Sequence, residues 1–319
     1  MAYGPHDDPT AGPSPDERER LAAIRAADSL AALVDVTGAA DEHEAYFDAK
    51  ETWFDLRGTE LAAAQSGGGL PGERVVVDGQ PFVVHGITHA DTAAERDFLQ
   101  DYVGRYLAAG DDVYCEQGIR SMYFGTWEAA CAMDDYSWAK RRSEELGGES
   151  AFGGSEFDSL VDDVASVASQ FRDTVFALIE SGSDVYGEAF AAALGDLASD
   201  FLMSHGDVAT AEDFRSFALS NRAAEDPGTL ADLQRYYERA FLPQPLEREW
   251  LRRHDPELEL VTHARNARMA DYAVYHAVDG DDDGVVHLVV GAAHQPGVRY
   301  YLEAHRDDRR DLGGFELVE

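Results

Sequence analysis

Two short apolar runs, each leading into Gly-x-x-His, stand out in the pattern of hydrophobic and polar positions. The first is Pro81-Phe-Val-Val-His-Gly-Ile-Thr-His89, and the second is Val286-His-Leu-Val-Val-Gly-Ala-Ala-His294. Each pattern predicts a short buried strand, then a glycine (Gly86 or Gly291) that lets the backbone turn sharply, then a histidine. Helical patterns follow over 92–107 and 298–305. Because ligands collect outside the carboxyl ends of strands in α/β sheets, His89 and His294 are expected to meet there.

Further strands are predicted around these two. Residues 74–85 read as a β-hairpin with Asp78-Gly79 in the turn, and 112–116 reads as a strand that ends in Glu116. A right-handed strand-helix-strand connection would make the strands parallel and bring His89 and Glu116 to one edge of the sheet. A second hairpin is predicted from 272–278 and 285–290, and a last strand over 315–318.

The rest of the chain is predicted to be helical. Residues 1–15 are rich in Pro, Gly and Asp and read as a disordered tail, and 16–319 as a single domain. Almost no strand pattern occurs over about 126–253, which predicts a helical insertion between two halves of the sheet. The predicted fold is therefore α/β, with a central mixed β-sheet, a pseudo-repeated β-α core, flanking helices and a large helical insertion.

Charge narrows the possible environment and partners. The 319 residues include 62 acidic and 26 basic ones, for a formal net charge of -36, and the acids are spread along the chain. This pattern is typical of a halophilic protein with an acidic surface that works where high salt screens self-repulsion. It argues against nucleic acid or a membrane as partner. Two cysteines, no signal peptide and no apolar run of membrane-spanning length predict a location in a high-salt cytosol.

Histidine and carboxylate side chains at strand ends suggest hydrolytic chemistry. His89, Glu116 and His294 could bind a divalent metal such as zinc, manganese or cobalt, or could activate water without one. Arg265 could bind a carboxylate or an oxyanion, and Asn266 could orient one of these groups. The structural alternatives are hydrogen-bonded histidines without catalytic roles and a surface salt bridge at Arg265. Arg268, on the same helical turn, could fill the role given to Arg265 instead.

The order of these motifs is similar to the TraB/PrgY and Tiki group, whose wider superfamily includes erythromycin esterase and ChaN-like proteins. The residues that carry the resemblance are Gly86, His89, Glu116, Arg265, Asn266, Met269, Gly291 and His294. The resemblance implies that both Gly-x-x-His motifs, the Glu and the Arg share one cleft, and that the activity is metal-dependent proteolysis or ester hydrolysis. The chain departs from the group at Ile87 and Ala90 within the first motif, and at Gln117-Gly118 after the glutamate.

Three hypotheses follow. The first is a metal-dependent hydrolase that cleaves peptide or ester bonds in a peptide or small-molecule substrate. The second is a non-catalytic regulatory protein that binds a peptide or haem in the same cleft. The third is a helical scaffold with structural histidines, which spatial separation of the two Gly-x-x-His histidines would favour. The sequence gives no oligomeric state.

Overall fold

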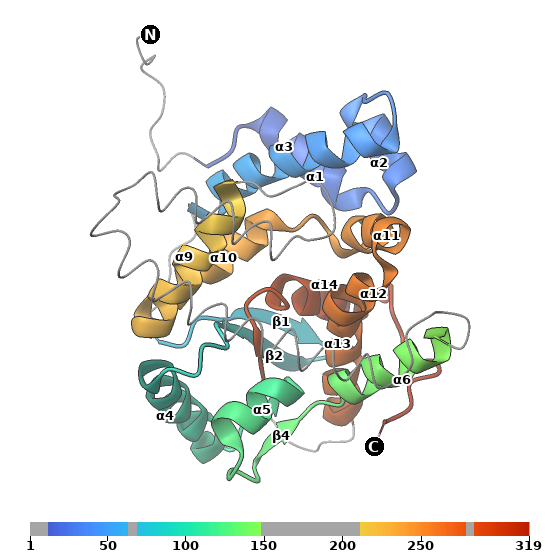
Figure 1. The fold of residues 1–319 in the computed structure, drawn as a ribbon. Helices are drawn as coiled ribbons and strands as arrows, with labels where there is room; N and C mark the ends of the chain where they lie inside the picture. Colours follow the sequence, from blue (N-terminus) through green and yellow to red (C-terminus); the bar gives the residue numbers. More distant parts are fainter. Residues whose placement is uncertain (1–11, 63–68, 148–210, 279–283, 319) are drawn as a thin grey trace, which may run out of the picture. The chain divides into compact units, whose positions relative to one another are not determined.

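The computed structural model shows a mixed five-stranded β-sheet with helices packed on it, as predicted (Figure 1). The strand order is β1-β2-β5-β3-β4. The strands are β1 (Glu73–Val77), β2 (Gln80–Ile87), β3 (Asp112–Cys115), β4 (Ala130–Ala132) and β5 (Val286–Gly291). The first two form the predicted antiparallel hairpin, in which Asp78 and Gly79 both take the left-handed conformation of a tight turn. The other neighbouring pairs are parallel.

The two apolar runs form β2 and β5, which are neighbours at the centre of the sheet. Strand β5 is buried at every position, as expected for a parallel strand with both faces covered. It pairs with β2 through Ile87 and Gly291, and with β3 through Cys115 and Val289. The three strands therefore end at nearly the same level, and the residues that follow them project from one edge of the sheet.

Helices cover both faces of this sheet (Figure 1). One face packs on α13 (Arg265–Val278) and α14 (Gln295–Arg306), where Val84 and Leu288 meet Met269 and Val298. Neighbouring strand residues point to the opposite face, where His287 stacks on Tyr106 of α4 (Ala93–Ala109). Helix α5 (Gln117–Phe124) contacts β3 and β5.

The other helices form further layers and connections. A separate apolar cluster joins α1 (Pro15–Ala26), α2 (Leu30–Thr37) and α3 (Glu42–Ala62) to α11 (Gln244–His254). The remaining elements are α6 (Asp135–Gly147), α9 (Ala211–Glu225), η1 (Pro227–Thr229), α10 (Leu230–Ala240), α12 (Pro256–Glu259) and the π-helical η2 (Leu260–Ala264). Within the ranges that the structure describes, no helix combines the length and the apolar character needed to cross a bilayer.

The structure describes residues 12–62, 69–147, 211–278 and 284–318. The chain divides into two compact units, one of 1–139 with 222–319 and one of 140–221. The described parts of the second unit, 140–147 and 211–221, are helical. Within the predicted insertion of 126–253, β4 joins the sheet at one end and α10 contacts β2 at the other, and the bounds of the insertion stay a prediction. Residues 148–210, and most of the tail 1–15, lie outside the described residues.

Two strand predictions are wrong. Residues 272–278 form the second half of α13, where Ala270, Ala273 and Val274 enter the core at helical spacing. The β-branched and aromatic residues there favoured a strand locally, but packing against the sheet selects the helix. Residues 315–318 form no strand and pair with no other strand; the amide of Val318 donates to the Asp134 carboxylate.

Candidate functional site

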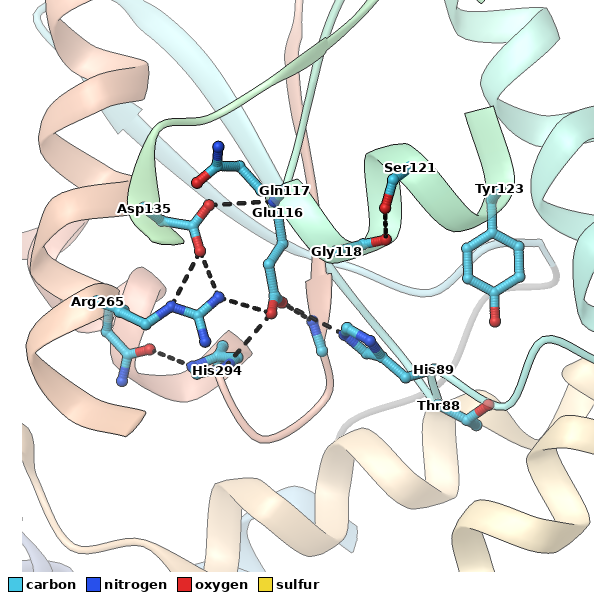
Figure 2. A network of polar contacts seen from close by, with 12 residues as sticks. Thr88, His89, Glu116, Gln117, Gly118, Ser121, Tyr123, Asp135, Arg265 and His294 are labelled. Atoms are coloured by element: carbon cyan, nitrogen blue, oxygen red, sulfur yellow. Dashed lines mark hydrogen bonds and ion pairs between the residues drawn. The ribbon is translucent and has the colours of Figure 1, made fainter. Parts of the chain in front are cut away.

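Three predicted side chains lie together at the carboxyl edge of the sheet (Figure 2). His89 follows β2, Glu116 follows β3 and His294 follows β5. Glu116 lies between the two histidines: its Oε2 atom is 3.4 Å from Nε2 of His89, and its Oε1 atom is 3.9 Å from Nε2 of His294. The parallel register of the three strands produces this arrangement. Separation of the two histidines would have favoured the scaffold hypothesis, and the two lie beside the same carboxylate instead.

Glu116 is a buried carboxylate with several donors around it. Its side chain is 6% exposed and does not cap α5, although Glu116 is the N-cap residue. Oε2 accepts the backbone N–H of Gly291 at 2.9 Å, and Oε1 accepts Nη2 of Arg265 at 2.8 Å. Burial alone would raise the pKa of Glu116, but the charges of His89 and Arg265 outweigh it and hold the pKa well below its usual range. Glu116 is therefore a carboxylate at physiological pH.

His294 is held as a neutral imidazole with a defined tautomer. Its Nδ1 atom lies 2.8 Å from Oδ1 of Asn266, an acceptor, so Nδ1 carries the proton and Nε2 presents a lone pair toward Glu116. Asn266 is itself fixed, since Nδ2 donates to Oε1 of Gln244 at 3.1 Å. Burial lowers the pKa of His294 to about 4, against the opposing charge of Glu116. Asn266 thus occupies the orienting position that the sequence suggested.

His89 differs from His294 in both exposure and charge. Its side chain is 33% exposed, whereas that of His294 is 14% exposed. Burial of the ring would lower the pKa of His89, but the adjacent Glu116 carboxylate outweighs burial and raises the pKa above its ordinary value. The two histidines beside one carboxylate therefore have pKa values shifted in opposite directions, a pattern that separates acid from base roles.

Gly86 and Gly291 serve a different purpose from the one predicted. Both lie inside strands, and neither has a positive φ. A Cβ atom on Gly291 would sit 3.0 Å from Nε2 of His89, and one on Gly86 would sit 2.9 Å from the Cα atom of Ala292. Glycine is needed at these positions for close approach, not for a turn. The left-handed residue after β2 is His89 itself, at φ 62°.

Arg265 lies behind Glu116. Its side chain is 7% exposed and makes four hydrogen bonds: one to Glu116, two to Asp135 and one to the carbonyl oxygen of Val261. The π-helical turn η2 immediately precedes it, and such turns are frequent at functional sites. Its role as a substrate or oxyanion clamp stays a prediction, and the position that it occupies favours holding Glu116.

Asp135 is the site residue that sequence reasoning missed. It is fully buried, pairs with Arg265 and accepts the backbone N–H of Gln117 at 3.1 Å (Figure 2). The neighbouring Asp134 pairs with Arg268 instead, so the two arginines one turn apart have separate partners and Arg265 faces the site. The only signal in the sequence was a pair of aspartates directly after the short run 129–133, and nothing in it indicated the pairing with Arg265.

Binding of zinc, manganese or cobalt at His89, Glu116 and His294 stays a prediction. The donor types suit these ions. Among the residues that the structure describes, however, no three His, Cys, Asp or Glu side chains are placed to hold one ion together. Both Glu116 oxygens already accept hydrogen bonds, and a guanidinium lies against one of them.

Compared with known proteins, the chain matches no protein-family model, no curated protein and no solved structure. The similarity to the TraB/PrgY and Tiki group therefore rests on the motifs alone and stays a prediction.

Proposed function

We propose that this protein is a hydrolase that cleaves a peptide or ester bond with a pair of histidines held by one glutamate. The observation that carries the proposal is the placement of two imidazoles on either side of one buried carboxylate, with Nε2 of His89 at 3.4 Å and Nε2 of His294 at 3.9 Å from the Glu116 oxygens. The opposite directions of the two histidine pKa shifts support it. A general base must be deprotonated and a general acid protonated at the same pH, and oppositely tuned environments achieve this.

In the proposed reaction, Nε2 of His294 takes a proton from the attacking water, since its lone pair is available and Nδ1 is occupied by Asn266. The imidazolium that forms is stabilised by the Glu116 carboxylate, with Nε2 3.9 Å from Oε1. His89, the more exposed of the two, donates its proton to the leaving group or to the oxyanion. Arg265 and the Gly291 amide keep Glu116 ionised throughout.

The test is hydrolysis of chromogenic esters and fluorogenic peptides in concentrated KCl by the wild type, His89→Ala, His294→Ala and Glu116→Gln. We expect each site variant to lose about 100-fold or more in kcat/KM, since positioned acid-base groups contribute about that much. His254→Ala, at an exposed histidine on the last turn of α11, is the matched control and should retain full activity. Equal activity in the control and in both histidine variants would refute the proposal.

Metal content is measured on the same purified proteins. Stoichiometric zinc, manganese or cobalt that is lost in His89→Ala and His294→Ala would establish a metal-dependent site. Retention of a peptide or haem by the wild type without turnover of any substrate would favour the non-catalytic binding protein.

A further inference from the structure

The turn that carries His89 has an unusual backbone. Two of its residues, His89 at φ 62° and Asp91 at φ 53°, take the left-handed conformation although neither is glycine. This conformation costs roughly 1–2 kcal/mol for each such residue. The conformation persists only if surrounding contacts fix it, and non-glycine residues of this kind gather at functional sites.

One carboxylate supplies most of these contacts. Glu95, in the first turn of α4, is fully buried. It accepts the backbone N–H of Thr88 at 2.8 Å, the hydroxyl of Thr88 at 2.6 Å, the backbone N–H of Ala90 at 3.1 Å and the hydroxyl of Tyr123. The amides on either side of His89 thus converge on a single anion. Concave sets of backbone N–H groups in such turns are anion-binding arrangements, and here the anion is a side chain of the protein itself.

Glu95 does not have the role that its place in the helix would normally give it. Thr92 and Glu95 have the spacing of a capping box, in which the glutamate returns to the N-cap amide. That arrangement occurs at the start of α1, where Glu17 accepts the amide of Ser14 at 2.7 Å. At the start of α4, Thr92 caps the helix with its own side chain, but the Glu95 carboxylate binds the His89 turn instead.

We propose that Glu95 is the positioning residue of the site: it fixes the left-handed backbone of His89 and so holds the imidazole against Glu116. The consequence for catalysis rests on the proposed function, whereas the placement of His89 does not.

The experiment is NMR spectroscopy of the histidine rings in the full chain at high salt and one fixed pH, without substrate. In Glu95→Gln, which keeps the shape of the side chain but not its charge, the NOE contacts of the His89 ring with Gly291 should weaken, and the contacts of the His294 ring with Asn266 should be unchanged. Thr92→Ala is the control: loss of the N-cap costs about 1 kcal/mol of stability but should leave the His89 contacts as in the wild type. Thr88→Val removes only one donor to Glu95, and should weaken the same His89 contacts by less if Glu95→Gln does not fold.

Unchanged contacts between the His89 ring and Gly291 in folded Glu95→Gln would overturn the proposal. If Glu95→Gln does not fold, unchanged contacts in Thr88→Val would do so, and an equal loss of contacts in Thr92→Ala would overturn it as well. If an active substrate is known, Glu95→Gln should lower kcat about tenfold or more with little change in KM, because misplacement of a catalytic group affects chemistry more than binding. Loss of the His89 contacts in a variant of a protein without hydrolase activity would leave the positioning role intact and remove only the proposed function.

Discussion

Replacing Arg265 by methionine should lower the free energy of unfolding by about 3–5 kcal/mol, the cost of leaving buried charges without their partner. The Arg265 side chain is 7% exposed, and its two acidic partners, Glu116 and Asp135, are 6% and 0% exposed. Nη2 lies 2.8 Å from Oε1 of Glu116, and Nε lies 3.0 Å from Oδ2 of Asp135. Without the guanidinium, two carboxylates remain in the same buried region, so each must either stay charged at high cost or take up a proton.

Urea unfolding at constant, concentrated KCl measures this change. Arg306→Met is the matched control, since Arg306 pairs with Asp307 at 2.7 Å but the two side chains are 47% and 40% exposed, and such a pair contributes at most about 1 kcal/mol. Combining Arg265→Met with Asp135→Asn should recover part of the loss, because one of the two unpaired charges is removed. If Arg265→Met lowers the free energy of unfolding no more than Arg306→Met does, Arg265 contributes no more than an exposed ion pair. The description of Glu116 as a buried carboxylate stabilised by Arg265 is then wrong.

Two further predictions concern the pH dependence of stability and the space around His89. Burial lowers the pKa of His85 to about 3, so as pH falls from about 6.5 toward 3 the unfolded chain binds a proton that the folded protein does not. The stability that neutral His85 contributes is fully present above that pH window and is lost as the pH falls through it. His85→Phe should therefore reduce the slope of the unfolding free energy against pH by up to about 1.4 kcal/mol per pH unit within the window. An unchanged slope, measured by urea unfolding at several pH values, would contradict this. Gly291→Ala places a Cβ atom 3.0 Å from Nε2 of His89, so it should displace the His89 ring from Glu116 and cost about 1–3 kcal/mol of stability. The displaced ring should titrate at lower pH in NMR spectra. A titration of His89 like that of the wild type would show that the added methyl group does not displace the ring.

Much of the fold could be predicted because its strands carry strong local signals. The turn Asp78-Gly79 identified the first hairpin, and the run 286–290, apolar except for His287, identified a buried strand. The signal failed over 272–278, where Tyr272 and Val274 have strand propensity but the buried positions recur at helical spacing. The local sequence pattern also failed to predict β4, because its three residues are too few to show a period. This strand forms through parallel pairing with β3.

The candidate site was predictable in its residue types but not in its connections. His89, Glu116 and His294 each follow a strand, and that regularity is visible along the chain. Asp135 follows a segment without a clear pattern, and Glu95 has the spacing of a helix cap, so neither gave a signal of its part in the site. Both act through contacts between segments that come together only when the sheet and its helices pack.

The sequence by itself determined four of the five strands, β1, β2, β3 and β5, together with the order of the motifs along them and the acidic character of the chain, since these depend on residue type and local spacing. Only the tertiary structure decided that His294 is neutral, that the pKa of His89 is raised and that Arg265 is committed to Glu116 and Asp135. Protonation and ion pairing depend on burial and on the distance to charges from remote parts of the chain, and the sequence contains neither quantity until the chain is folded.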